Sequence, residues 1–277
     1  MSDIPVGEQV SPSRVKLTEV SNKPLVTSKV TDSAFEKILP FSTDLELRDR
    51  YINFFGGLRL GKMLEDLDLI AGEVAYKHTE GWERGMTIVT AACDRIDLLG
   101  ELRSDRDLQL LSSINWVGRS SLEVGVRISS KEGKSWVRVA RAYFIMVARS
   151  EGKAEPVNSL EPVNKNEQRR FKQGEQRQQE RRAIAQTSYL HNTPTAYESH
   201  VLHDLFLLIK NSEIKGVSMK DSIRQSTLLM HPQSRNVHNN IFGGYLMREA
   251  FELAWNITYL FCRKRPQFVS MDHMYFY

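Results

Sequence analysis

The feature that most constrains the fold is a long amphipathic segment from about Leu58 to His78. Apolar side chains recur in it at three- and four-residue spacing, which is the pattern of a helix with one buried face. The stripe is formed by Leu60, Leu64, Leu67, Ala71, Val74 and His78, and it is widened by Met63, Ile70 and Ala75. We therefore expect a long helix that the rest of its domain largely encloses.

The segment after this helix is rich in β-branched and aromatic residues. It contains four expected strands, at Met86–Cys93, Leu108–Val117, Ser121–Ser129 and Trp136–Ala148. Glu132-Gly133-Lys134 marks a hairpin turn between the last two. A long buried helix followed by antiparallel strands predicts an α+β domain, over residues 34–150, in which a sheet wraps one helix.

Changes in composition divide the remaining chain into three parts. Residues 1–33 have no clear hydrophobic period and are expected to form a disordered tail. Residues 151–200 are polar and basic, so we expect an interdomain linker that is helical along part of its length. Residues 201–277 are expected to hold a short helix near Val201–Ile209, a strand at Ser226–Met230, a second amphipathic helix that ends near Phe261, and a strand at Phe268–Phe276.

The charge of the chain is mild and excludes little. The formal net charge is +4 at pH 7, and much of the excess lies in Lys165–Arg182, which also contains acids and few aromatic residues. A solvated helix is therefore a simpler interpretation of that segment than nucleic-acid binding. No apolar run reaches the roughly 18 residues that span a bilayer, so we expect no membrane insertion. His200 and His203 can share a helix face but lack an evident third ligand, so we expect no metal.

The two expected amphipathic helices align with each other without gaps. The matched positions are Gly61 with Gly244, Met63 with Leu246, Leu64 with Met247, and Ala71 with Ala254. Since any two amphipathic helices share a period, the polar differences are more informative. Asp68 falls on Phe251, and Asn240 falls on Gly57.

Asp68 and Asn240 each have a structural and a functional interpretation. Asp68 lies against the apolar stripe, where burial of a carboxylate is costly and raises its pKa unless charges or hydrogen bonds compensate. It is either a functional acid or an acid at the stripe edge that reaches solvent or an arginine. Asn240 precedes a Gly-Gly helix start, where asparagine is also a favoured helix cap. On pattern alone, the structural interpretation of each residue is the simpler one.

Several longer stretches resemble one family. They are Leu60–Asp68, Ile114–Val124, Phe144–Arg149, His231-Pro232-Gln233 with Arg235-Asn236, and Ile241–Arg248 continuing to Ala254. Together and in this order, they are similar to the acyl-coenzyme A thioesterases of the mitochondrial 9/10 type, over about residues 33–277. The Phe-Gly-Gly triplet alone is a weak signal, but the combination is specific.

The resemblance implies two hotdog domains, each a long helix wrapped by an antiparallel sheet, that pack as a pseudo-dimer. It also implies hydrolysis of acyl-CoA without a cofactor, and homo-oligomers formed through hotdog packing. The family's active site lies between two hotdogs, with an aspartate from one helix and an asparagine near the start of the other. By position these are Asp68 and Asn240, and because each half has lost the other member, we expect one composite site.

The resemblance further suggests roles for the residues around this site. Backbone N–H groups at Gly243 and Gly244 are expected to face the thioester carbonyl oxygen, aided by the helix dipole. Asp68 would be a general base for water or a direct nucleophile, and both remain open. Asn240 would orient the water or the thioester. Arg119 and Ser120 match a family loop and are candidates for contacts with coenzyme A, although an exposed β-turn is the simpler interpretation.

The resemblance also implies that the second hotdog is incomplete. In the family, the strand near Phe268 is followed by several more, whereas this sequence ends at Tyr277. We therefore expect one complete and one incomplete hotdog. An inactive acyl-CoA-binding or regulatory form that assembles with full-length subunits remains an alternative to an enzyme. The family implies a mitochondrial location, but the N-terminal residues do not resemble a transit peptide, so a cytoplasmic location stays open.

Overall fold

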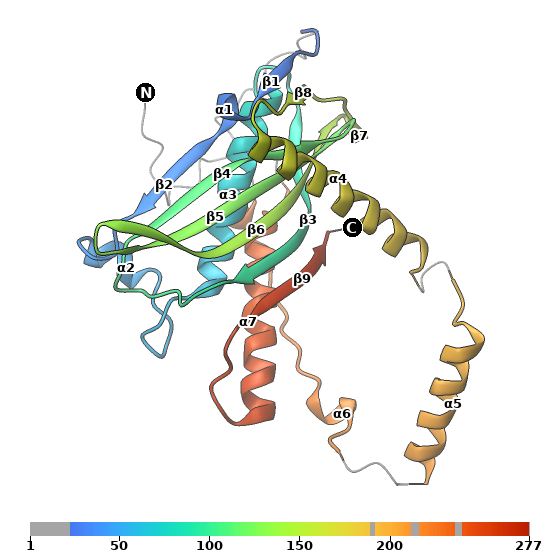
Figure 1. Ribbon diagram of the computed structural model, residues 1–277. Coiled ribbons are helices and arrows are strands. Elements are labelled where there is room, and N and C mark those ends of the chain that lie inside the picture. The colour runs from blue at the N-terminus through green and yellow to red at the C-terminus, as the bar shows by residue number, and fades with distance from the viewer. Residues whose placement is uncertain (1–22, 189–191, 212–215, 236–239, 277) are drawn as a thin grey trace.

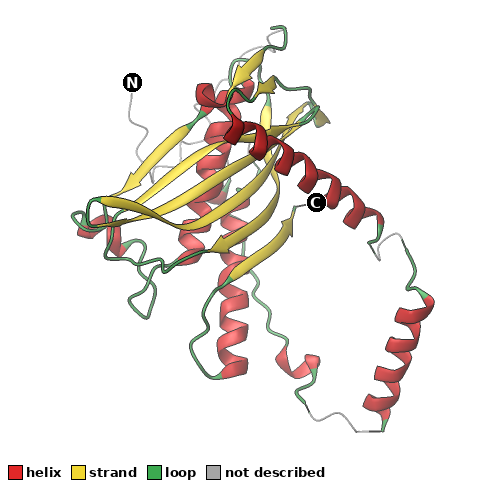
Figure 2. Ribbon diagram, viewed as in Figure 1, coloured by secondary structure: helices red, strands yellow, loops and turns green. Residues whose placement is uncertain are grey.

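The computed structural model describes residues 23–188, 192–211, 216–235 and 240–276. Its main body is a seven-stranded antiparallel sheet that wraps the long helix α3 (Leu60–Thr79), as Figures 1 and 2 show. The strands are β2 (Phe35–Leu39), β3 (Thr87–Leu98), β4 (Leu108–Val117), β5 (Ser121–Glu132), β6 (Ser135–Ser150), β7 (Lys153–Ala154) and β9 (Ser270–Tyr275). Their order is β2-β4-β5-β6-β3-β9, and β7 pairs with β6. The predicted α+β layout is confirmed.

Shorter elements precede and follow this body. β1 (Thr27–Lys29) pairs in parallel with β8 (Ser159–Glu161). The remaining elements are α1 (Val30–Ser33), α2 (Leu45–Asp49), α4 (Lys165–Gln186), α5 (Ala196–Lys210), α6 (Met219–Ser222), the 3-10 helix η2 (Pro232–Ser234) and α7 (Gly243–Cys262). Within the described ranges, the helices are too short or too polar to cross a membrane.

The helix α3 forms the centre of the core because its apolar stripe faces the sheet. Five residues of the stripe are at most 1% exposed: Met63, Leu67, Ala71, Val74 and Ala75. They share one hydrophobic cluster with Val124 of β5 and Phe144 of β6. Full burial of a side chain the size of valine, leucine or methionine contributes about 1.5–3 kcal/mol, so this stripe fixes the helix against the sheet.

The helix α7 packs against the side of α3 that the sheet leaves uncovered. A Cβ atom on Gly61 would lie 3.0 Å from Arg248 Cγ, and one on Gly244 would lie 2.9 Å from the backbone oxygen of Glu65. Residues later in α3 contact residues earlier in α7, so the two helices run antiparallel. Glycine permits this close approach, because a Cβ atom at Gly244 would press on the Glu65 backbone.

This contact between α3 and α7 has approximate two-fold symmetry. The alignment that places Gly61 on Gly244 also places Glu65 on Arg248. The contact of Gly61 with Arg248 is therefore the counterpart of the contact of Gly244 with Glu65. The ion pair of Glu65 with Arg248, at 2.9 Å, joins two equivalent positions and so lies on the pseudo-two-fold axis. Such self-complementary contacts are typical of symmetric dimers, and here one chain supplies both helices.

We expect Gly61→Val to loosen α7 from the rest of the protein. The new Cβ would lie 2.7 Å from Glu252 Oε1, and overpacking of this kind costs about 1–3 kcal/mol. Hydrogen exchange should accelerate in α7 more than in α3, whereas the control Gly72→Ala, whose Cβ meets no described atom within 4 Å, should leave α7 protected. Unchanged protection of α7 in Gly61→Val would contradict this packing.

The last strand, β9, extends the sheet of the first half. It pairs antiparallel with the edge of β3, with Cys93 opposite Met274 and Asp97 opposite Ser270. The strand predicted at Phe268–Phe276 therefore exists, but its partner belongs to the first domain. The two halves share one continuous sheet as well as a helix pair (Figure 1).

The helix α4 covers the outer face of the sheet, opposite α3 (Figure 1). Its Arg177 forms two hydrogen bonds with Glu123 of β5, of 2.5 and 2.9 Å, and Glu123 is 0% exposed. Arg181 donates to Asp94 of β3 at 2.7 Å. His273 of β9 contacts the other oxygen of Asp94 at 3.0 Å. This buried charge network fastens α4 to both halves of the chain.

Three expectations are corrected by the structure. Residues 27–33 lie in the predicted disordered tail, but they form β1 and α1, because β8 supplies a strand partner and Val30 is buried. The helix predicted within the linker exists, but it docks on the sheet because its arginines meet buried carboxylates. Ser226–Met230 is a loop rather than a strand, since no described strand pairs with it.

Candidate active site

Asp68 is a buried acid in the middle of α3, with a side chain only 1% exposed. Thr90 of β3 donates a hydrogen bond from Oγ1 to Asp68 Oδ1 at 2.7 Å. The other oxygen, Oδ2, has no hydrogen-bond partner among the described residues, and a Cβ on Gly243 would lie 3.3 Å from it. Asp68 thus does not reach solvent, and it forms no ion pair with the described arginines. The stripe-edge interpretation of this residue is wrong.

The N-terminal end of α7 points at this carboxylate. Gly243 and Gly244 are the first two residues of the helix, and a helix N-terminus carries a partial positive charge together with unpaired N–H groups. Because a side chain at Gly244 would strike the backbone of Glu65, the glycine is required for the helix to begin this close to α3. The contact of two sequence-distant helices brings together an acid and a set of backbone donors.

The surroundings of Asp68 change its acidity. Burial raises the pKa of its carboxyl to about 6 from an ordinary value of 3.8, while the Thr90 hydrogen bond and the Gly244 backbone N–H act in the opposite direction. A carboxyl with a pKa near 6 is ionised at neutral pH and is a stronger base than an exposed aspartate. The nearby Cys93 is a poor nucleophile, because burial raises the pKa of its thiol far above neutral pH.

Thr90 is a site residue that the sequence did not reveal. It lies in a β-rich segment where threonine is an ordinary strand residue, and nothing in its local pattern marks it. The strand β3 is irregular just after it, with a register shift between Thr90 and Ala92. A bulge in a strand re-aims side chains and often accompanies functional sites, but only the folded register reveals this one.

The other predicted residues stand in different relations to Asp68. Asn240 is exposed and lies in the segment that leads into α7, on the Gly243 side of the helix. Arg119 and Ser120 form the turn between β4 and β5, and their backbone oxygens accept hydrogen bonds from Val157 and Ala148. His78, at the far end of α3, contacts the neighbouring Asn158 backbone. Because Val157 bonds to the turn and the next residue, Asn158, contacts His78, the turn lies near the His78 end of α3. This end is ten residues from Asp68, or about 15 Å along the helix at 1.5 Å per residue.

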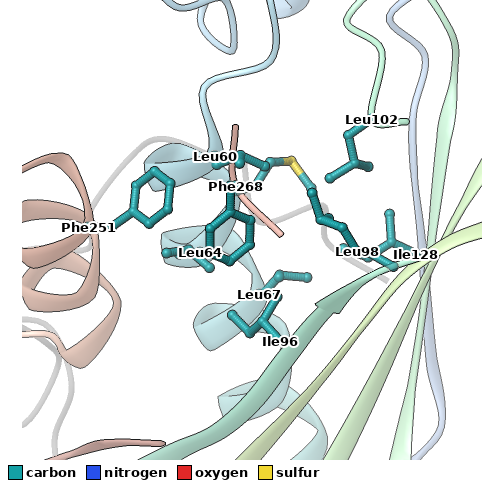
Figure 3. Close-up of a pocket in the computed structure, with 11 residues that line it drawn as sticks. Leu60, Leu64, Leu67, Ile96, Leu98, Leu102, Ile128, Phe251 and Phe268 are labelled. Atoms are coloured by element: carbon teal, nitrogen blue, oxygen red, sulfur yellow. The ribbon is translucent and has the colours of Figure 1, made fainter. Parts of the chain in front are cut away.

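The pseudo-symmetric counterpart of the Asp68 position is apolar. There Phe251 stands in place of the aspartate and packs edge-on against Phe268, with ring centroids 5.3 Å apart. Figure 3 shows the small pocket beside them, which is lined by Leu60, Leu64, Leu67, Ile96, Leu98 and other apolar residues. No ionisable side chain lines this pocket, so it has no group that can activate water.

Comparisons with known proteins agree with this architecture. Residues 52–137 match the family model described as the thioesterase superfamily. Over 274 residues, the chain is 38% identical to mouse mitochondrial acyl-coenzyme A thioesterase 9, and the match covers 92% of this chain and 62% of the relative. It is 34% identical to the chloroplastic acyl-coenzyme A thioesterase 2 of Humulus lupulus, which it covers to 61%.

Among solved structures, an acyl-CoA hydrolase from Staphylococcus aureus, determined with butyryl coenzyme A and coenzyme A, has the same fold. Its TM-score is 0.50 at 24% identity, and the match covers 57% of this chain and 92% of that one. The helix wrapped by an antiparallel sheet is therefore the hotdog fold. The chain spans about three fifths of the length of the curated relatives named here. It belongs to the thioesterase superfamily, and its sequence is similar to acyl-coenzyme A thioesterases that include the mitochondrial 9 and 10 types.

Proposed function

We propose that this chain hydrolyses acyl-CoA thioesters at a single composite site, formed by Asp68 of α3 and the start of α7. The observation that carries the proposal is the buried Asp68 carboxylate, with Oδ2 unpaired among the described residues and turned toward Gly243. The names of the curated relatives, which are acyl-coenzyme A thioesterases, supply the substrate class. The apolar Phe251 counterpart supports one site rather than two.

The chemistry requires a base and a stabiliser of negative charge. In the proposed reaction, Asp68 takes a proton from water while the water oxygen bonds to the thioester carbonyl carbon. The negative charge then develops on the carbonyl oxygen, where backbone N–H groups at Gly243 and Gly244 would stabilise it. Collapse of the intermediate breaks the carbon–sulfur bond, and the proton passes to the departing thiolate. Asn240 is proposed to orient the water or the thioester.

A direct attack by Asp68 would give the same products through an acyl-enzyme anhydride. Label in the Asp68 carboxyl after a single turnover in water enriched in the heavy oxygen isotope would show the second route. A general base leaves Asp68 unlabelled, whereas hydrolysis of an anhydride at the aspartyl carbon transfers label into the Asp68 carboxyl.

The rate of hydrolysis should rise with pH through about 6. Burial raises the pKa of Asp68 to about 6, and only the ionised carboxylate accepts a proton. We therefore expect kcat/KM to fall about tenfold for each pH unit below 6 and to level off above 7. Thiol release from a medium-chain acyl-CoA measures the profile. A flat profile from pH 4.5 to 8 would contradict the role of Asp68 as a base.

An acyl-CoA-binding or regulatory protein is the alternative outcome of this assay. Tight binding of acyl-CoA without turnover, together with co-elution with a longer relative, would support it.

The Arg119 and Ser120 turn is proposed to contact the coenzyme A moiety, and Arg119→Ala tests this as an increase in KM with kcat unchanged. The relatives' names support an organellar, mitochondrial location. Homo-oligomers through hotdog packing are proposed and are tested by sizing.

A further inference from the structure

Gly72 occupies an unusual position in α3. It lies four residues after Asp68, well inside the helix, where glycine is the least favourable residue apart from proline. A Cβ atom placed on it would meet no described atom within 4 Å. The glycine is therefore not explained by close packing against the described residues.

The other glycines within long helices show the contrast. A Cβ on Gly61 would come within 2.7 Å of Glu252, and one on Gly174 of α4 would come within 2.5 Å of Trp116. Each of those glycines allows two elements to approach closely. Gly72 leaves open space instead, next to the proposed catalytic carboxylate.

Helix geometry places this space on the Asp68 side of α3. Residues four apart lie one above the other on a helix, so Asp68 and Gly72 share a face. Leu69, three residues before Gly72, is 50% exposed. One turn after Gly72, Tyr76 turns toward β3, where its hydroxyl accepts a hydrogen bond from the Ile88 N–H, and its ring stacks on Trp82. Leu69 and Tyr76 therefore flank the position that Gly72 leaves open, one turn along α3 from Asp68.

The pseudo-symmetric counterpart of this surface is closed. The alignment that places Gly61 on Gly244 places Gly72 on Trp255 and Tyr76 on Tyr259. Trp255 stacks on Tyr259, with ring centroids 5.5 Å apart, and also contacts Phe55 at 5.7 Å. Near Phe251, the aromatic rings of Trp255 and Tyr259 thus fill this position. Near Asp68, the equivalent position is Gly72, and it is open.

We propose that Gly72 determines acyl-chain length, because the space it leaves holds the acyl chain of a thioester whose carbonyl lies at Asp68. This inference rests on the proposed function. The side chains of Leu69 and Tyr76 beside this space suit methylene groups better than the amide-rich pantetheine arm, whose amides would need hydrogen-bond partners when buried. A large side chain at position 72 would occupy the same space and would limit the substrate to short chains.

Binding of non-hydrolysable S-alkyl coenzyme A thioethers tests this inference without relying on turnover. Full burial of a methylene group tightens binding about fourfold, so wild type should bind dodecyl-CoA much more tightly than ethyl-CoA. We expect Gly72→Trp to weaken dodecyl-CoA at least tenfold while leaving ethyl-CoA within about twofold. Glu73→Trp, at an exposed neighbour on another face, controls for the bulk of the new ring and should bind both ligands as wild type does.

The outcomes separate this inference from the proposed function. Equal chain-length dependence in wild type and a folded Gly72→Trp variant overturns the role of Gly72, as does equal weakening of both ligands, which would indicate the pantetheine arm. Absence of chain-length dependence in wild type also overturns it. Failure of hydrolysis, with the binding pattern intact, overturns only the catalytic proposal. Thermal unfolding of each variant confirms that it is folded.

Discussion

Asp68→Asn should reduce thiol release from acyl-CoA by a factor on the order of 10²–10⁴ while leaving the protein folded, since removal of a general base costs about this much. Asparagine keeps the size of the side chain and can accept the Thr90 hydrogen bond, but it cannot take a proton from water. The matched control is Glu73→Gln, which neutralises an exposed acid on the same helix and should keep full activity. Undiminished turnover in folded Asp68→Asn would refute the assignment.

The same variant has a stability signature with a defined sign. The folded-state pKa of Asp68, about 6, lies above its ordinary 3.8, so the folded protein holds this proton more tightly than the unfolded chain does. Protonated Asp68 therefore contributes roughly 3 kcal/mol to the free energy of unfolding. This contribution is fully present below about pH 4 and is lost as the pH rises through about 6. Asp68→Asn should remove this pH dependence, so its stability relative to wild type should be higher at pH 8 than at pH 4. Chemical denaturation at the two pH values measures the difference.

Arg177→Met should destabilise the protein by about 3–5 kcal/mol, as expected when one partner of a buried ion pair is removed. Glu123 is 0% exposed and would retain only the Asn115 amide at 3.1 Å and the Arg181 guanidinium at 3.9 Å. Since Arg177 also lies over the Tyr143 ring, methionine preserves part of that packing.

Urea denaturation of Arg177→Met, Glu123→Gln and the double variant tests whether α4 is integral to the fold. The double variant should recover much of the loss, because no uncompensated buried charge remains. Additive losses, or a loss below 1 kcal/mol in Arg177→Met, would indicate that α4 is a solvated linker after all. That result would support the sequence-based prediction that Lys165–Arg182 forms a solvated helix.

The sequence predicts those elements whose signal is local. The α3 stripe and the alternation in β5 follow directly from side-chain period, because each of these elements packs one face against the core. The position of Asp68 in the stripe and the Gly243-Gly244 helix start are readable for the same reason. The alignment of the two helices also predicts their pseudo-symmetry, since glycines that allow close approach occur at equivalent positions.

The remaining features depend on partners that are distant in the sequence. The docking of α4 requires Glu123 and Asp94, and no local pattern distinguishes these two acids from ordinary strand residues. Thr90 reaches Asp68 only through the register of β3. The pairing of β9 with β3 requires the edge that β3 leaves free. No periodicity in a single segment contains this information.

The central claim is that Asp68 is a base of unusual pKa inside the substrate site, and carbon-13 NMR of aspartate carboxyl groups tests it directly. We predict one resonance that titrates near pH 6 in wild type, is missing in Asp68→Asn, and shifts when a non-hydrolysable S-alkyl coenzyme A binds. An Asp68 carboxyl that titrates near 4, or one that the bound ligand leaves unchanged, would contradict it.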